Sequence, residues 1–202
     1  MSAFDSLFAT GINSGKRVTN AIAQASRRTG VDFNYLLGQA QVESSLNPAA
    51  RAATSSATGL YQFIDQSWLA VINQHGDQYG LGWAAEAIQQ NGAGRYFVAD
   101  PTLRQQIMDL RNHPETASVM AAEHAADNKA FLESRLGRAA QPVDLYLAHF
   151  LGAGGAVKFL NAMATDPGAS GAAVVPAAAR ANRSIFYDRQ GNARSLADIR
   201  NS

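Results

Sequence analysis

The chain has 202 residues, 47% of them hydrophobic and 16% charged, which is enough for one folded domain and is not typical of a disordered protein. A net charge of +1 gives no indication of a nucleic-acid partner. The absence of cysteine excludes disulfides, thiolate zinc sites and cysteine nucleophiles, and the four histidines lack the close spacing of a metal-binding helix.

The sequence also predicts neither a membrane span nor a secretion signal. No apolar run has the length of a membrane span, so we predict no membrane insertion. Residues 1–18 lack the basic and apolar segments of a secretion signal, which leaves the route of export open.

Alanine-rich helical periodicity predicts a mainly α protein, and no strand is predicted. The expected helices cover residues 16–30, 33–45, 65–76, 83–92, 100–110, 114–137, 142–152 and 155–164. From Thr165 onward the sequence is rich in Pro, Gly and Ala, a composition typical of linkers. We therefore expect one compact helical domain over residues 1–164, followed by a linker and C-terminal tail over residues 165–202, with a possible short helix after Ser195.

The helix predicted over residues 33–45 carries one acid near its apolar side. At about 100° per residue, an apolar stripe forms from Phe33, Leu36, Leu37 and Ala40. Glu43 lies about 20° beyond this stripe, in the last turn before the break at Asn47-Pro48. The helix dipole and partial burial both favour the protonated carboxyl there, which a general acid requires. The alternative is an ordinary surface glutamate.

A long polar loop of small residues follows Glu43, as expected where backbone lines an open groove. The loop leads to Gly59, which suits a close approach. It then leads to Gln62, whose amide can donate to and accept from sugar groups.

These motifs resemble a known family. Glu43-Ser44, Asn47-Pro48-Ala49 and Gly59-Leu60-Tyr61-Gln62 are similar to the first two motifs of lytic transglycosylases with a soluble-lytic-transglycosylase-type, goose-lysozyme-like catalytic domain. Tyr61 stands where the family usually has Met. The resemblance implies a lysozyme-like fold with a substrate groove.

The third family motif, Ala-Tyr-Asn-Ala-Gly, is less well matched by "LYLAHFLGAGG". Aligning Ala148 and Gly152 to the motif puts His149 at the tyrosine position. Alternatively Tyr146, one turn earlier, supplies the phenol, and we favour this interpretation. Both residues could instead belong to the core.

Glu123 and Asp127 lie four residues apart on one face of an Ala-rich helix. One interpretation is that both side chains belong to a solvated helix face. The other is that Glu123 lies near the floor of the groove and orients the substrate or Glu43. His75 and His113 are expected at the surface or in turns.

The resemblance implies cleavage of the β-1,4 bond between N-acetylmuramic acid and N-acetylglucosamine in peptidoglycan, with a 1,6-anhydro product. Glu43 would be the general acid and base, and Ser44 would steady Glu43 or contact the sugar. Further substrate contacts would come from Gly59, Tyr61, Gln62, Glu123 and Tyr146. The resemblance implies no metal and no cofactor. The alternatives are a hydrolase similar to goose-type lysozymes and a non-catalytic glycan-binding scaffold protein. The expected partner is the glycan strand in the periplasm or cell envelope, and an association with wall-spanning machinery is left open.

Overall fold

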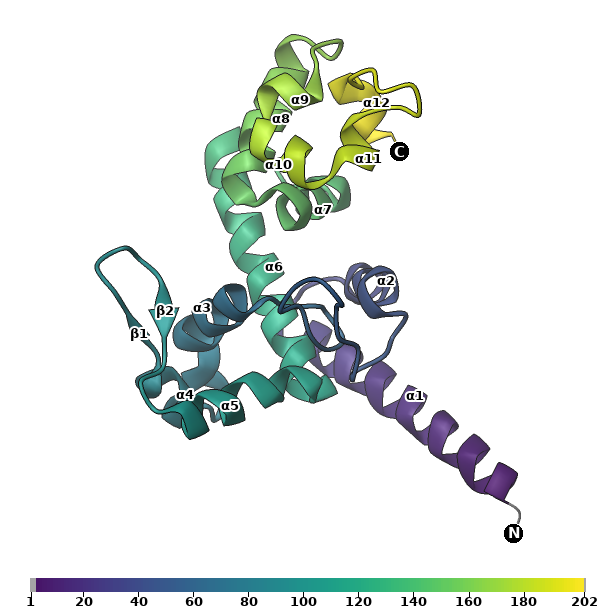
Figure 1. The fold of residues 1–202 in the computed structure, drawn as a ribbon, viewed down its shortest axis with the longest axis vertical. Coiled ribbons are helices and arrows are strands. Elements are labelled where there is room, and N and C mark those ends of the chain that lie inside the picture. The colour runs from purple at the N-terminus through teal and green to yellow at the C-terminus, as the bar shows by residue number, and fades with distance from the viewer. Residues whose placement is uncertain (1–2, 202) are drawn as a thin grey trace. The chain divides into compact units, whose positions relative to one another are not determined.

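A computed structural model describes residues 3–201, with side chains from residue 15 onward. It is 67% helical with little sheet, which confirms the predicted mainly α fold (Figure 1). The chain forms two compact units, residues 1–124 and 125–202. This division falls inside one helix, whereas the sequence suggested a boundary at residue 164.

The first unit contains five helices and two short 3-10 segments: α1 (Ala3–Thr29), α2 (Phe33–Ser44), α3 (Asp65–His75), η1 (Gly76–Tyr79), α4 (Gly82–Ala87), α5 (Pro101–Asp109) and η2 (Leu110–Asn112). Helix α6 (Pro114–Leu136) begins in this unit and extends beyond its boundary. At the centre of its core, Trp68 is fully buried and its indole nitrogen donates to the Ile107 carbonyl oxygen over 2.8 Å. This hydrogen bond satisfies the one polar group of an otherwise apolar side chain.

A short hairpin interrupts the helices of this unit. Strands β1 (Gln89–Gln90) and β2 (Tyr96–Phe97) pair antiparallel, so the helix predicted over residues 83–92 ends at Ala87. The side-chain oxygen of Asn91 accepts from the backbone N–H groups of Ala93 and Arg95 and closes the turn. Such local bonds favour a turn over a helix, which explains why the helical prediction was too long.

The second unit contains the rest of α6 and six helices: α7 (Pro142–Leu151), α8 (Ala153–Thr165), α9 (Gly171–Val174), α10 (Pro176–Ala181), α11 (Arg183–Phe186) and α12 (Leu196–Arg200). Asp144 is fully buried in this unit, where it binds Arg138 over 2.6 Å and the Gln141 backbone N–H over 2.9 Å. Burial alone would raise the pKa of Asp144, but these two hydrogen bonds hold it below its usual value.

The segment from residue 165 onward was expected to be a linker and a tail with a possible short helix after Ser195. Its described residues form that helix, α12, and also helices α9 to α11. Phe186 and Leu196 from this segment are fully buried with Phe159 of α8. A Cβ atom at Gly171 would meet the end of the Ile199 side chain of α12, which would have to shift, so glycine allows the two segments to pack closely. The small residues that suggested a linker therefore serve helix packing.

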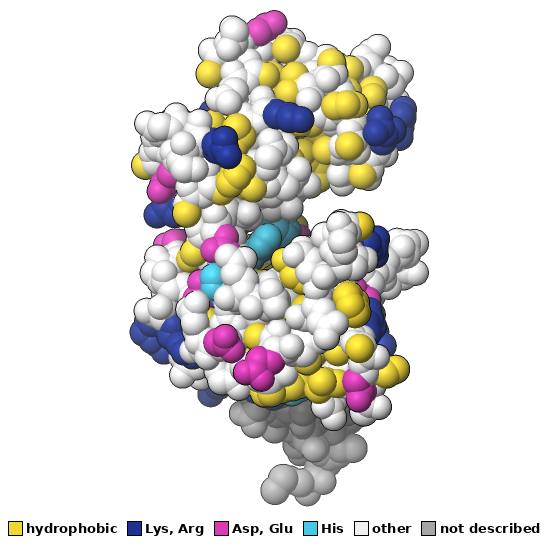
Figure 2. Space-filling view, turned by 90° about the vertical axis from the view of Figure 1, so that its left-hand side faces the viewer, with side chains coloured by type: hydrophobic (Ala, Val, Ile, Leu, Met, Phe, Trp, Pro, Cys, Tyr) yellow, Lys and Arg dark blue, Asp and Glu magenta, His cyan; other side chains and the backbone are white. Residues whose placement is uncertain are grey.

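Basic and acidic side chains occur in small separate groups over the face drawn in Figure 2. Within the described residues, no helix has both the length and the apolar character needed to cross a membrane.

Candidate active site at the end of helix α2

Helix α2 has a defined start and a sharp end. The Asp32 side chain accepts from the Tyr35 backbone N–H over 2.8 Å, as predicted for an N-cap. At the other end, Ser45 and Leu46 both adopt left-handed backbone conformations, with φ of 53° and 62°. Their N–H groups donate to the carbonyl oxygens of Gln41 and Ala40 and so satisfy the last turn.

Glu43 occupies the last turn of α2 and is half-buried. The predicted stripe behind it is present, since Leu36 and Ala40 are fully buried. The glutamate therefore lies at the border of the apolar stripe, as its helical spacing indicated.

Ser44 connects this helix end to the loop that follows. Its hydroxyl donates to the Leu60 carbonyl oxygen over 2.7 Å and lies 3.1 Å from the Ala40 carbonyl oxygen. The residue after Glu43 therefore fixes the Gly59–Gln62 segment to α2. Both contacts are made within the protein, whereas the two roles expected for Ser44 were to steady Glu43 or to contact the sugar.

Gly59 and Gln62 form a tight turn. Gly59 has a φ of 84°, and a Cβ atom at this position would overlap the carbonyl oxygen of Arg111. The Gln62 amide nitrogen donates to the carbonyl oxygens of Gly59, over 2.9 Å, and Ala50, over 3.2 Å. None of the described residues donates to its amide oxygen, so a ligand could use that oxygen as an acceptor.

Backbone strain is concentrated around this site. Among the described residues, only Ser45, Leu46 and Gln62 have a positive φ without being glycine. All three lie in the segment that carries the two motifs. Such conformations cost about 1–3 kcal/mol each and cluster at functional sites, where the surrounding structure maintains them.

Tyr61 is a core residue in the structure, and the expected groove-lining role needs correction. Only 2% of the side chain is exposed, and its hydroxyl donates to the Leu36 carbonyl oxygen over 3.0 Å. Burial raises the pKa of Tyr61 well above its usual value. A hydroxyl that caps a buried helix carbonyl is not available to a sugar.

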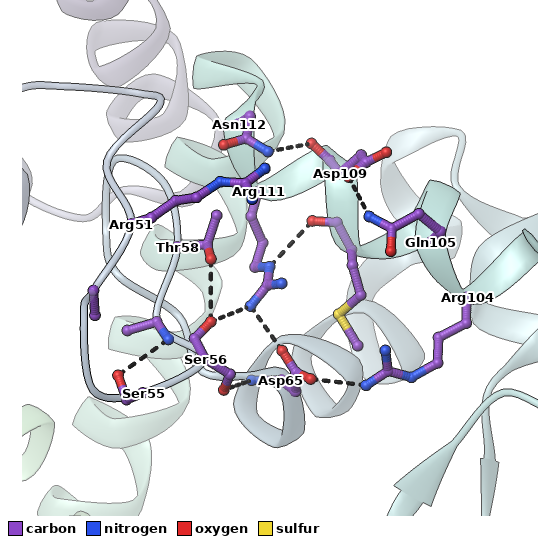
Figure 3. A pocket seen from close by; sticks show the side chains of 13 residues that line it. Arg51, Ser55, Ser56, Thr58, Asp65, Arg104, Gln105, Asp109, Arg111 and Asn112 are labelled. Atoms are coloured by element: carbon purple, nitrogen blue, oxygen red, sulfur yellow. Dashed lines mark hydrogen bonds and ion pairs between the residues drawn. The ribbon is translucent and has the colours of Figure 1, made fainter. Parts of the chain in front are cut away.

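Arg111, which the sequence analysis did not single out, holds the loop from the opposite side. Its Nη1 donates to the carbonyl oxygens of Ser56, over 2.8 Å, and Phe63, over 3.0 Å. It also binds the Asp65 carboxylate over 3.0 Å (Figure 3). Burial lowers the pKa of this guanidinium, and the nearby Asp65 acts in the opposite direction. The only signal in the sequence was Gly59, which indicated that some backbone must pass close by.

Residues 20–80 match the family model of the transglycosylase SLT domain. The match covers α2, the loop and α3, so it contains both motifs of the resemblance. It confirms a soluble-lytic-transglycosylase-type domain and supports a family of glycan-cleaving, lytic-transglycosylase-type proteins. The mainly α architecture agrees with such a lysozyme-like domain.

Glu123 lies outside the SLT match and is held within the first unit. The Tyr79 hydroxyl donates to its Oε1, and His75 Nδ1 lies 3.5 Å from its Oε2. Burial and the Glu123 carboxylate together raise the pKa of Tyr79 to about 12. His75 is 8% exposed, so the surface position expected for it was wrong, whereas His113 is exposed as expected. These contacts favour a structural role for Glu123 between α6 and η1.

Tyr146 also lies outside the SLT match, in the second unit. Its side chain is 48% exposed and lines a cavity of about 320 Å³ with Leu147 and Phe150 of the same helix. His149, the alternative at the third motif, is half-buried. The contact of Tyr146 with a substrate at Glu43 stays a prediction.

No group of three or more His, Asp or Glu side chains within the described part of the chain has an arrangement that could hold a metal ion.

Proposed function

We propose that this protein is a peptidoglycan lytic transglycosylase in which Glu43 acts first as general acid and then as general base. The observation that carries the proposal is the Ser44–Leu60 hydrogen bond. It joins the helix end bearing Glu43 to the Gly59–Gln62 turn, and both lie within the SLT match. The strained backbone at Ser45, Leu46 and Gln62 supports a functional site at the same place.

The proposed reaction begins with protonation of the bridging oxygen of the β-1,4 bond by Glu43. Positive charge then develops at C1 of the muramoyl unit, where the N-acetyl group of the substrate can stabilise it. Glu43, now a carboxylate, takes the proton from the C6 hydroxyl, and that oxygen attacks C1 to form the 1,6-anhydro ring. The attacking group is already tethered to the reacting carbon, which lowers the entropic cost. The amide oxygen of Gln62 would accept from an N–H or hydroxyl of the bound sugar.

A hydrolase of the goose-type lysozyme class is the alternative on the same residues, with water in place of the C6 hydroxyl. Its product is heavier by one water molecule than the anhydro product. Mass spectrometry of fragments released from purified peptidoglycan therefore decides between the two reactions. The substrate lies outside the cytoplasm, so we propose the periplasm or cell envelope as the site of action.

The role of Glu43 is tested by Glu43→Gln. Removing a general acid is expected to lower the rate of fragment release by about 100-fold or more. Glu86→Gln, a change at an exposed glutamate of α4, is the matched control and should keep the wild-type rate. Thermal unfolding of both variants shows whether the fold is retained. A folded Glu43→Gln protein with the wild-type rate would refute the proposed role.

A further inference from the structure

A polar cavity of about 330 Å³ lies between the loop at residues 51–58 and the segment formed by α5 and η2 (Figure 3). Glu43 and the rest of α2 do not line it. Its volume is at the lower end of the range for small-molecule sites, about 300–1,000 Å³. The cavity therefore has room for a small chemical group and is separate from the proposed catalytic residue.

Arg111 presents a fixed guanidinium edge to this cavity. Its Nε donates to the Met108 carbonyl oxygen over 3.1 Å, and its Nη1 makes the three contacts described above. No described residue accepts from Nη2, and the side chain is 9% exposed. Because the guanidinium is held in place by the protein, little conformational entropy is lost when Nη2 binds a ligand.

The charges around the cavity leave a cationic excess. Its lining includes three arginines, Arg51, Arg104 and Arg111, and two aspartates, Asp65 and Asp109. Asp65 is already bound by Arg104 over 2.7 Å and by Arg111 over 3.0 Å.

The second aspartate, Asp109, accepts from the neutral Gln105 amide over 2.7 Å and keeps its charge, so the lining carries an excess of one positive charge. Arg51 is exposed and extends from the loop toward η2, and no carboxylate of the described chain forms an ion pair with it (Figure 3). Arg51 is therefore the cation that remains for an incoming anion.

We propose that this cavity binds the free carboxylate of a short peptide, with Arg51 and Nη2 of Arg111 as its donors. Guanidinium groups match the planar geometry of a carboxylate. Ser55 on the loop side and Asn112 on the η2 side of the cavity carry neutral polar groups that suit the amides of a peptide. The assignment of this peptide to the stem of peptidoglycan rests on the proposed function, whereas carboxylate binding itself does not.

The binding step is tested by titrating the protein with acetyl-D-alanyl-D-alanine, which has one free carboxylate, and with its C-terminal amide. Backbone amide NMR signals of residues 51–58 and 110–112 report on binding. The free acid should shift these signals and the amidated peptide should not. Inorganic phosphate is the third probe, and an equal response to phosphate would overturn the peptide carboxylate as the ligand.

Arg51→Gln should weaken binding of the acid by about threefold to fivefold, as expected for one solvent-exposed charge contact. Arg95→Gln makes the same change in net charge at another exposed arginine of the first unit and should bind as the wild type does. Equal affinities of the two variants, or equal binding of acid and amide, would overturn the proposal.

The peptidoglycan assignment has its own test, which uses glycan strands with and without stem peptides. The ratio of KM between stripped and intact strands should fall in Arg51→Gln and stay at the wild-type value in Arg95→Gln. An unchanged ratio in both variants would overturn the stem peptide as the ligand. The titration is carried out on Glu43→Gln protein as well, so its result is independent of whether Glu43 is catalytic.

Discussion

The Ser44 hydroxyl and the Leu60 carbonyl oxygen, separated by sixteen positions, lie 2.7 Å apart and form a hydrogen bond. Ser44 directly follows Glu43, and Leu60 lies inside the Gly59–Gln62 turn. This hydrogen bond, together with the one from Tyr61 to Leu36, holds the proposed substrate-binding turn against the helix that carries the proposed acid. The position of Glu43 depends on the loop as much as on its own helix.

Ser44→Ala removes this link while keeping good helix propensity. We expect a loss of stability of about 1 kcal/mol. We also expect kcat/KM to fall by more than the loss of folded protein explains, because the turn loses its link to the end of α2 that carries Glu43 and keeps only the Tyr61–Leu36 hydrogen bond to that helix. Ser134→Ala is the control, since the Ser134 hydroxyl binds only a carbonyl of its own helix among the described residues. Urea unfolding and turnover of purified peptidoglycan check the prediction. It fails if both variants have equal kcat/KM.

Gly59→Ala tests the close approach between the turn and Arg111. The added Cβ would overlap the Arg111 carbonyl oxygen, and φ is already positive at 84°, so we expect a loss of at least about 2 kcal/mol. Gly80→Ala is the matched control, because Gly80 has a φ of 74° but open space around its Cβ position. It should cost about 1 kcal/mol from backbone strain alone. Equal unfolding free energies for the two variants would show that the approach to Arg111 is not tight.

The local features of α2 could be predicted from the sequence. The Asp32 cap, the buried pair Leu36 and Ala40, and the half-buried position of Glu43 all follow from helical spacing and end signals within a short window. These features need no information about distant parts of the chain. For the same reason the SLT motifs were recognisable before the fold was known.

Features that depend on tertiary packing were missed. Tyr61 fits a groove or a core equally well by composition, and only its contact with Leu36 decides between them. Arg111 lies 55 residues from Ser56 in the sequence, so no local pattern connects the two. Residues 165–202 have linker-like composition, yet Phe186 and Leu196 have an apolar core to join. Each error arose where distant residues determine the environment.

Arg111→Gln tests whether this arginine maintains the loop. Its loss leaves the carbonyls of Ser56 and Phe63 without their shared donor, in a buried position for Phe63. Asp65 keeps Arg104 as a partner. We expect about 3 kcal/mol of destabilisation. Arg104→Gln removes the other arginine bound to Asp65. The Arg104 side chain is 41% exposed, so its loss should cost at most about 1 kcal/mol. Proteolysis within residues 51–58 should accelerate in Arg111→Gln and not in Arg104→Gln. Similar unfolding free energies in both variants would contradict the role of Arg111.

The second unit should respond to acid through Asp144. The pKa of this buried carboxyl is held below its usual value, so its contribution to stability is present above the unfolded-state pKa of about 3.9. It is lost as the pH falls through the lower pKa of the folded state. At pH 7, Asp144→Asn should therefore be less stable than the wild type by about 2–3 kcal/mol, because the charged hydrogen bonds to Arg138 and Gln141 are weakened.

The difference between wild type and Asp144→Asn should shrink as the pH is lowered from 5 toward 2, as measured by urea unfolding. Asp166→Asn, at an exposed aspartate of the same unit, is the control and should change stability little at any pH. A difference for Asp144→Asn that stays constant down to pH 2 would mean that its charge does not stabilise the fold.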